Sequence, residues 1–142
     1  MNDISKHKDD GYQISTDNEM LDVDLIINFL CSSYWGKDYK PENILKSIEN
    51  SFCFGLYIAK RQIGFARVIT DYMHFAWLAD VFIVPEMRGK KCGKIFMEAI
   101  LGHPDLIDVK RWRLATLDAH NFYSKFGFTP PVYPERFMER VK

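Results

Sequence analysis

With 142 residues, of which 47% are hydrophobic and 15% aromatic, the chain has enough apolar material for one core, and we expect a single domain over residues 1–142. Lys plus Arg and Asp plus Glu each number 19, so no net charge creates the field that gathers nucleic acid or an anionic membrane. The three cysteines are odd in number and widely spaced, which fits neither a disulfide framework nor a metal site.

The N-terminal part of the chain predicts one strand and two helices. Residues 1–11 are polar and expected to be frayed, and a short strand follows near Tyr12–Ser15. Asp22 can cap a helix that ends near Gly36, with the apolar stripe Val23, Ile26, Ile27 and Leu30. Pro41 suits the first turn of a second helix through Asn50, whose buried side is Ile44, Leu45 and Ile48.

The middle of the chain predicts a meander of three antiparallel strands. Phe52–Ala59 and Ile63–Thr70 are apolar runs joined by a hairpin at residues 60–62, and Phe75–Val84 follows the polar break at Asp71. Pro85 stops the third strand because proline cannot donate to a ladder.

The last third alternates between helices and strands. A helix is expected from Gly89 to Gly102, burying Cys92, Ile95, Phe96, Ala99 and Ile100. Arg111–Leu117 predicts a strand, and Asp118 and Gly127 can cap the two ends of a short helix that buries Ala119, Phe122 and Phe126. A final strand is expected at Phe137–Val141. The fold class is therefore α/β, a mixed and mostly antiparallel sheet with helices on both faces.

A run of cations stands where the helix near Gly89 begins. Arg88, Lys90, Lys91 and Lys94 surround a helix N-terminus, which already carries positive charge, and each exposed cation there costs roughly 0.3–1 kcal/mol. A bound anion reverses the sign, and Gly89 and Gly93 leave backbone amides open to phosphate oxygens. The alternative is a solvated basic turn.

This block resembles the acetyl-CoA-binding motif of the GNAT superfamily, Arg/Gln-x-x-Gly-x-Gly/Ala after a strand. Here it reads Arg88-Gly89-Lys90-Lys91-Cys92-Gly93, with Lys91 at the central glycine. A positive φ at that position would make the lysine a liability, whereas an ordinary φ would let its ammonium assist phosphate binding, and we expect the second. The resemblance implies that Arg88 through Lys94 hold the pyrophosphate, and that the backbone of Val81 and Ile83 binds the pantetheine arm as an added strand.

A second resemblance lies downstream, in the right order and spacing. Residues 119–128, AHNFYSKFGF, are similar to the family helix Ala-x-x-Phe/Leu-Tyr-x-Lys-x-Gly-Phe, and Asn121 is assigned to coenzyme binding with it. Thr116 stands where the family often has Asn. Shorter stretches, among them LADVF at 78–82, resemble a bacterial branch of mostly unassigned substrate.

Two side chains are candidates for proton transfer. In the family the hydroxyl that corresponds to Tyr123 faces the coenzyme sulfur, so the resemblance implies a general acid, and half-buried packing is the alternative. Asp80 is a lone carboxylate on an apolar strand, suited either to a general base or to a structural role at a bulge. His74 and His120 are weaker candidates, and Cys92 is expected to pack in the core rather than act as a nucleophile.

The acceptor pocket is expected to include Tyr34, Trp35, Asp71 and Tyr72, with Trp77 either lining it or packing in the core. Two carboxylates, Asp71 and Asp80, favour a cationic amine. The resemblance implies an acetyl-CoA-dependent N-acetyltransferase without a metal, acting by direct attack on a small-molecule or peptide amine. No nucleic acid or membrane partner is expected, a homodimer is left open, and the absence of a signal peptide or apolar span predicts the cytoplasm. The alternatives are a non-catalytic acyl-CoA sensor and, further off, an interaction module.

Overall fold

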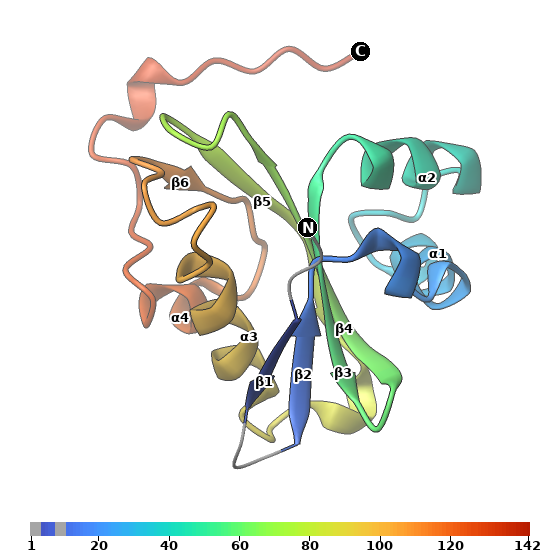
Figure 1. Cartoon of the computed structure of the whole chain (residues 1–142). Helices are drawn as coiled ribbons and strands as arrows, with labels where there is room; N and C mark the ends of the chain where they lie inside the picture. The colour runs from blue at the N-terminus through green and yellow to red at the C-terminus, as the bar shows by residue number, and fades with distance from the viewer. Residues whose placement is uncertain (1–3, 8–10) are drawn as a thin grey trace.

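The computed structural model describes residues 4–7 and 11–142 and consists of one sheet covered by helices. Six strands lie in the order β1-β2-β3-β4-β5-β6, and every neighbouring pair is antiparallel except β5 and β6, which are parallel. Helices α1 and α2 cover one face, while α3 and α4 lie on the other (Figure 1). The predicted fold class, a mixed and mostly antiparallel sheet with helices on both faces, is confirmed.

The first two strands form the outer edge of the sheet. β2, Tyr12–Ser15, is the predicted short strand, and it pairs with β1, Ile4–His7. The expected fraying of residues 1–11 is therefore wrong for residues 4–7, because the backbone of β2 offers them a free edge to pair with. Residues 1–3 and 8–10 lie outside the described part of the chain.

Two short helices follow the 3-10 turn Asn18–Met20. α1 spans Val23–Ser32, and the Asp22 carboxylate accepts a hydrogen bond from the Leu25 amide, which confirms the predicted cap. α1 ends before Gly36, because Ser33 already has an extended backbone; in the turn that follows, a Cβ added at Gly36 would lie 2.3 Å from the Leu30 carbonyl oxygen. α2 spans Pro41–Glu49, and its Leu45 is exposed rather than buried, so the buried side is Ile44 and Ile48 alone.

The predicted meander is confirmed as β3, Phe52–Ile58, β4, Arg61–Thr70, and β5, Ala76–Ile83. The hairpin loop is shorter than predicted: it consists of Ala59 and Lys60, both with positive φ, as tight two-residue turns between antiparallel strands require. Phe54, Leu56 and Phe65 from this meander are fully buried and form the centre of the core.

A bulge interrupts the pairing of β4 with β5. Phe65 pairs with Phe82 and Arg67 with Ala79, so Ala66 alone stands opposite two residues of β5, Asp80 and Val81. Asp80 takes up the extra length with a left-handed backbone, φ +56°. The bulge therefore fixes where the Asp80 side chain points.

The helix after β5 begins later than predicted. A 3-10 turn at Pro85–Met87 comes first, and α3 then spans Cys92–Leu101. α3 cannot begin before Cys92 because Lys91 has a left-handed φ of +64°. Its buried stripe contains the predicted Cys92, Ile95, Phe96 and Ile100 and adds Met97, whereas the predicted Ala99 is only partly buried.

The C-terminal elements are shorter than the sequence predicts. β6 contains only Trp112–Arg113, since the chain then turns away from β5, and α4 spans His120–Ser124. Asp118 does not cap α4; instead the Thr116 hydroxyl accepts a hydrogen bond from the Ala119 amide. Gly127, φ +91°, follows the helix as predicted.

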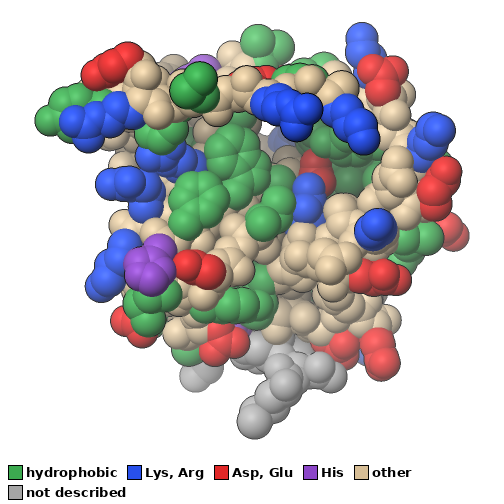
Figure 2. Space-filling view, turned by 90° about the horizontal axis from the view of Figure 1, so that it is seen from above, with side chains coloured by type: hydrophobic (Ala, Val, Ile, Leu, Met, Phe, Trp, Pro, Cys, Tyr) green, Lys and Arg blue, Asp and Glu red, His purple; other side chains and the backbone are tan. Residues whose placement is uncertain are grey.

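The predicted final strand Phe137–Val141 does not form. After the 3-10 turn Pro134–Arg136 the chain runs extended, with no strand partner in the described part, and Met138 is 98% exposed. The Arg113 guanidinium lies over the Phe137 ring, 3.5 Å from its centroid, and holds the start of this segment beside β6. Figure 2 shows the face above the sheet in Figure 1, where apolar side chains gather in the middle and charges of both signs lie around them.

Candidate active site

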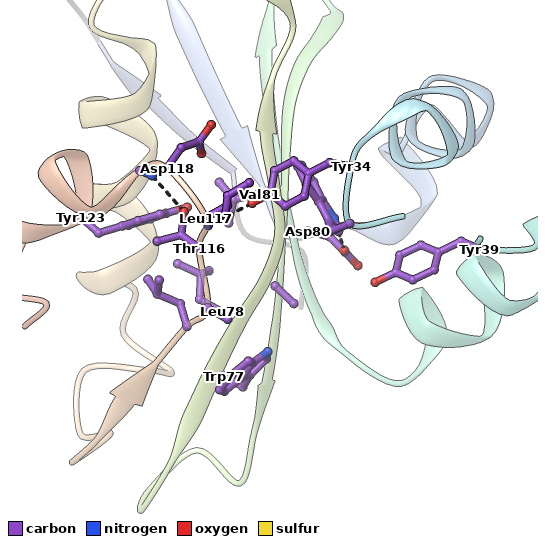
Figure 3. A pocket seen from close by; sticks show the side chains of 15 residues that line it. Tyr34, Tyr39, Trp77, Leu78, Asp80, Val81, Thr116, Leu117, Asp118 and Tyr123 are labelled. Carbon is purple, nitrogen blue, oxygen red and sulfur yellow. Dashed lines mark hydrogen bonds between the residues drawn. The ribbon is translucent and has the colours of Figure 1, made fainter. Parts of the chain in front are cut away.

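A cavity of about 430 Å³ lies where β5 and β6 separate (Figure 3). The two strands pair only at Ala76–Trp77 with Trp112–Arg113, and beyond this point residues 78–81 and 114–119 line opposite walls. Tyr34, Trp35 and Tyr39, from the loop between α1 and α2, close one side, and Tyr123 of α4 closes another. The sequence-predicted residues Tyr34, Trp35, Asp80, Val81 and Tyr123 are thus brought together.

Asp80 is held by two donors from opposite directions. One carboxylate oxygen accepts a hydrogen bond of 2.9 Å from the Trp35 indole, and the other accepts one of 2.9 Å from Nε of Arg67. Arg67 also donates to the Ser51 hydroxyl at 2.9 Å. Both Arg67 and Asp80 are largely shielded from water, their side chains being 14% and 4% exposed. A pair with such geometry fixes the carboxylate in place.

Tyr123 lines the cavity from the far wall, with its ring against Phe122 and Phe128. Burial, and to a lesser extent the nearby Tyr34, raise the pKa of Tyr123 to about 12. The hydroxyl therefore keeps its proton throughout the physiological range, as a hydrogen-bond donor must.

The loop after α1 reaches across the cavity. The Tyr34 hydroxyl accepts a hydrogen bond of 3.2 Å from the Leu117 amide on the opposite wall, while the next residue, Trp35, binds Asp80 of β5. Burial, and then the Asp80 charge, raise the pKa of Tyr39, and Arg67 partly opposes this. Figure 3 shows the Tyr39 hydroxyl directed toward Asp80.

Two predicted acceptor residues lie elsewhere. Asp71 and Tyr72 are in the loop between β4 and β5 and do not line the cavity. The Asp71 carboxylate accepts hydrogen bonds from the amides of Met73, His74 and Phe75, which hold its pKa well below the usual range. These contacts stabilise the turn, and Tyr72 is exposed with φ +67°.

The basic loop before α3 adopts the conformation that the sequence analysis did not favour. Lys91 has positive φ, so the expectation of an ordinary backbone at that position is wrong, and the side chain makes no cap to the helix. Gly89 also has positive φ, +76°, with open space where a Cβ would stand. Gly93 has a packing reason instead, since a Cβ there would lie 3.0 Å from the Phe122 ring.

The remaining predicted coenzyme residues differ in exposure and in contacts. Lys90 is exposed, Lys94 lies 3.9 Å from Glu98, and Asn121 is exposed on the first turn of α4. Cys92 is buried, with its sulfur 3.2 Å from the Tyr12 hydroxyl. Of the two residues predicted for pantetheine, Val81 lines the cavity and Ile83 does not; the Ile83 carbonyl accepts a hydrogen bond from Nε of Arg88.

Sequence reasoning missed Arg67 and Tyr39. For Arg67 a signal existed, because it is a lone cation in the apolar run of β4, as Asp80 is a lone carboxylate in β5. Two such opposite charges in consecutive antiparallel strands indicate a buried pair. Tyr39 carried no comparable signal. Within residues 4–7 and 11–142 no helix is long and apolar enough to cross a membrane, and no group of three or more His, Cys, Asp or Glu side chains could hold a metal ion.

Comparison with known proteins assigns the family. The model of the acetyltransferase (GNAT) domain matches residues 49–130, which include both cavity walls and the basic loop. Two proteins named putative acetyltransferases are similar: one from Gibberella zeae is 32% identical over 80% of this chain and 76% of its own length. The other, a crystal structure from Xanthomonas campestris pv. campestris assigned to the GNAT family, is 45% identical with a TM-score of 0.89, over 92% of this chain and 93% of its own.

A more distant structure, from Clostridium acetobutylicum, was solved with acetyl-CoA. It is 12% identical with a TM-score of 0.63, over 99% of this chain and 96% of its own, so it shows a shared fold. The family match over more than half of the chain and the two closer relatives agree with the splayed strands and the basic loop. The chain belongs to the GNAT family of acetyltransferases.

Proposed function

We propose that this protein is an N-acetyltransferase that moves the acetyl group of acetyl-CoA to an amine by direct attack in a ternary complex. The cavity between β5 and residues 114–119 carries the proposal, because it joins an open strand edge to a wall that holds a protonated tyrosine. An extended pantetheine arm can add to such an edge as a further strand. In this proposal acetyl-CoA is a substrate, and its pyrophosphate is held by residues 88–94.

Each residue of the site has a proposed task. The amine nitrogen attacks the acetyl carbon and releases one proton to water or to a base, the carbon–sulfur bond breaks, and the departing thiolate takes up a proton. Tyr123 is the proposed donor of that proton, and its raised pKa keeps it protonated until the sulfur develops charge. The acceptor is proposed to enter beside Tyr34, Trp35 and Tyr39. Asp71 and Tyr72 lie outside the cavity lining, and their contact with the acceptor stays a prediction.

A base role for Asp80 stays a prediction. Each of its oxygens already accepts one hydrogen bond, so proton removal from the amine needs a further contact, direct or through water. The second candidate function, a non-catalytic acyl-CoA sensor, rests on Lys91 and Thr116 at positions where the family has Gly and often Asn. The cytoplasmic location, the acceptor's identity and a homodimer also stay predictions.

The first experiment asks whether the coenzyme binds and reacts. A ligand that binds only the folded state at about 100 times its Kd stabilises it by roughly 2.7 kcal/mol, so acetyl-CoA should raise the Tm by several degrees. Free thiol release is then measured with a library of amines and peptides. A coenzyme-dependent Tm without amine-dependent thiol release would favour the sensor, and no thermal shift at saturation would reject both functions.

The second experiment tests the acid. Tyr123→Phe removes one hydroxyl and preserves the ring, so kcat should fall roughly 10²–10⁴-fold with little change in the Kd of acetyl-CoA. Tyr133→Phe, which alters an exposed tyrosine outside the cavity lining, is the matched control and should retain full activity. Nearly full kcat in Tyr123→Phe would show that the thiolate leaves without its help.

A further inference from the structure

The loop between α1 and α2 is fixed to the protein at two consecutive residues. Trp35 donates its indole N–H to Asp80 of β5, and Tyr34 accepts the Leu117 amide from the opposite wall of the cavity. The two rings also meet edge to face, with centroids 5.1 Å apart. Because Tyr34 and Trp35 are consecutive residues of one short turn, a displacement of either side chain also shifts the other.

The contact on β5 continues into the sheet. Asp80 is held from behind by Nε of Arg67, and Arg67 is itself held by the Ser51 hydroxyl at the end of the segment that follows α2. Arg67 does not line the cavity, and its side chain is only 14% exposed. Arg67 is hydrogen-bonded to Asp80, which does line the cavity, so it can position the cavity side chains through that carboxylate.

We infer that Arg67, Asp80 and Trp35 form a chain of positioning residues that places the Tyr34 hydroxyl across the acceptor side of the cavity. The inference rests on the proposed acetyl transfer for its kinetic consequence, but not for its structural one. Arg67 orients the Asp80 carboxylate, the carboxylate fixes the indole, and the indole sets the turn from which Tyr34 reaches Leu117. Tyr34 is the member whose hydroxyl the chain positions for the acceptor; Trp35 and Asp80 also line the cavity, whereas Arg67 does not.

The arrangement has a clear physical reason. Asp80 sits in a left-handed bulge, and the planar Arg67 guanidinium donates to its carboxylate from a fixed geometry. A hydrogen bond to a charged group is stronger than one between neutral groups. The indole is therefore held firmly, whereas Tyr34, 53% exposed and held by one neutral bond of 3.2 Å, depends on its neighbour for position.

The test is a double-mutant cycle on the two loop residues. Trp35→Phe keeps an aromatic ring and removes the indole N–H, and Tyr34→Phe removes the hydroxyl. Each should lower kcat/KM for the acceptor roughly 10-fold, with the Kd of acetyl-CoA unchanged, as expected for loss of one hydrogen bond of this kind. The double variant should also lose only about 10-fold in kcat/KM, because the loss of the Trp35 contact already frees the Tyr34 hydroxyl that the second substitution removes.

Arg67 is tested by conservative rescue. Arg67→Met removes both of its hydrogen bonds, whereas Arg67→Lys keeps a cation beside Asp80, so acceptor kcat/KM should be lower in the Met variant than in the Lys variant. Arg61→Met is the matched control on the same strand, since Arg61 forms an exposed ion pair with Glu86. Trp112→Phe is the control for the indole, because Trp112 lies in β6 and outside the cavity lining.

A readout that needs no activity separates this inference from the proposed function. Hydrogen exchange at the Leu117 amide should speed up several-fold in both Trp35→Phe and Tyr34→Phe, and it should stay unchanged in Trp112→Phe. If the wild type transfers no acetyl group but Leu117 responds in this way, the proposed function fails and the positioning chain stands. If Leu117 exchange is unaffected by Trp35→Phe, or if the two kinetic losses multiply to about 100-fold, the chain is overturned.

Discussion

Asp80 and Lys91 are both non-glycine residues with a left-handed backbone, and their surroundings differ completely. Asp80, φ +56°, is buried, and its side chain accepts hydrogen bonds from Trp35 and Arg67. Lys91, φ +64°, is exposed and caps nothing. A left-handed conformation costs a residue with a Cβ roughly 1–2 kcal/mol, so it persists only where other interactions offset it. At Asp80 the two side-chain hydrogen bonds can offset this cost, whereas the Lys91 side chain makes no helix cap that could do so.

The largest effect expected from this comparison is on Asp80. Asp80→Asn tolerates the left-handed backbone but leaves the Arg67 guanidinium buried without its counter-charge, which should cost about 3–5 kcal/mol in the free energy of unfolding. Urea denaturation measures the change. A loss below about 1 kcal/mol would show that the pair contributes little and that the two left-handed sites are more alike than their contacts indicate.

The same variant separates a base from a positioning role if it folds. A missing base should depress acetyl transfer most at low pH and recover toward the pKa of the amine, whereas a displaced Trp35 should lower the rate by the same factor at every pH. The pH profile of Asp80→Asn against the wild type decides between them.

Lys91→Gly should raise the free energy of unfolding, and by less than Asp80→Asn lowers it. Glycine adopts positive φ freely, so the variant should gain about 1 kcal/mol of stability, less the extra entropy of an unfolded glycine. Thermal denaturation without coenzyme gives this number. Titration of acetyl-CoA at two salt concentrations then shows whether the ammonium binds phosphate, because a lost charge contact also flattens the salt dependence.

Gly89→Ala is the mirror of that change in the same loop. Gly89 has φ +76° and nothing within 4 Å of an added Cβ, so only the backbone conformation opposes the substitution. We expect a loss of about 1 kcal/mol in thermal denaturation. An unchanged Tm would mean that the loop relaxes to another conformation, and the strain assigned to Lys91 would have to be reduced accordingly.

The smallest expected effect concerns pH. Burial raises the pKa of Tyr123 from 10.0 to about 12, so its stabilising contribution is complete below pH 10 and is lost as the pH rises toward 12. Between pH 7 and 10 the acetyl-transfer rate should rise as the amine loses its proton and show no decline caused by Tyr123. A decline near pH 9 that Tyr123→Phe abolishes would contradict this assignment.

Much of the fold could be predicted from the apolar periodicity and from the residues that begin or end helices and strands. The meander, the Asp22 cap and the buried stripe of α3 all come from local patterns that the structure retains. The failures share a different cause, which is the presence or absence of a distant partner. Residues 4–7 form a strand because β2 is available to pair, and residues 137–141 fail to form one because they find no neighbouring strand in the described part.

The same distinction between local patterns and distant partners applies to the candidate site. Tyr123 and the basic loop are recognised by motifs within short stretches of sequence, but the partners of Asp80 come from positions 45 and 13 residues away. Spacing along the chain cannot reveal that a bulge aims one carboxylate at both. Likewise the exclusion of Asp71 from the cavity depends on how far the loop between β4 and β5 extends, which residue types do not determine.

The meander described above also bears on the order in which the molecule assembles. β3, β4 and β5 are consecutive and joined by short loops, so their pairing needs little loop-closure entropy. β5 meets β6 only after the whole segment carrying α3 has been enclosed. We expect folding to begin in the meander and the cleft to close last, so that Leu56→Ala slows refolding while Trp112→Ala mainly speeds unfolding in stopped-flow measurements. On this expectation, the cleft proposed to bind the substrates is also the part that can open without unfolding the meander.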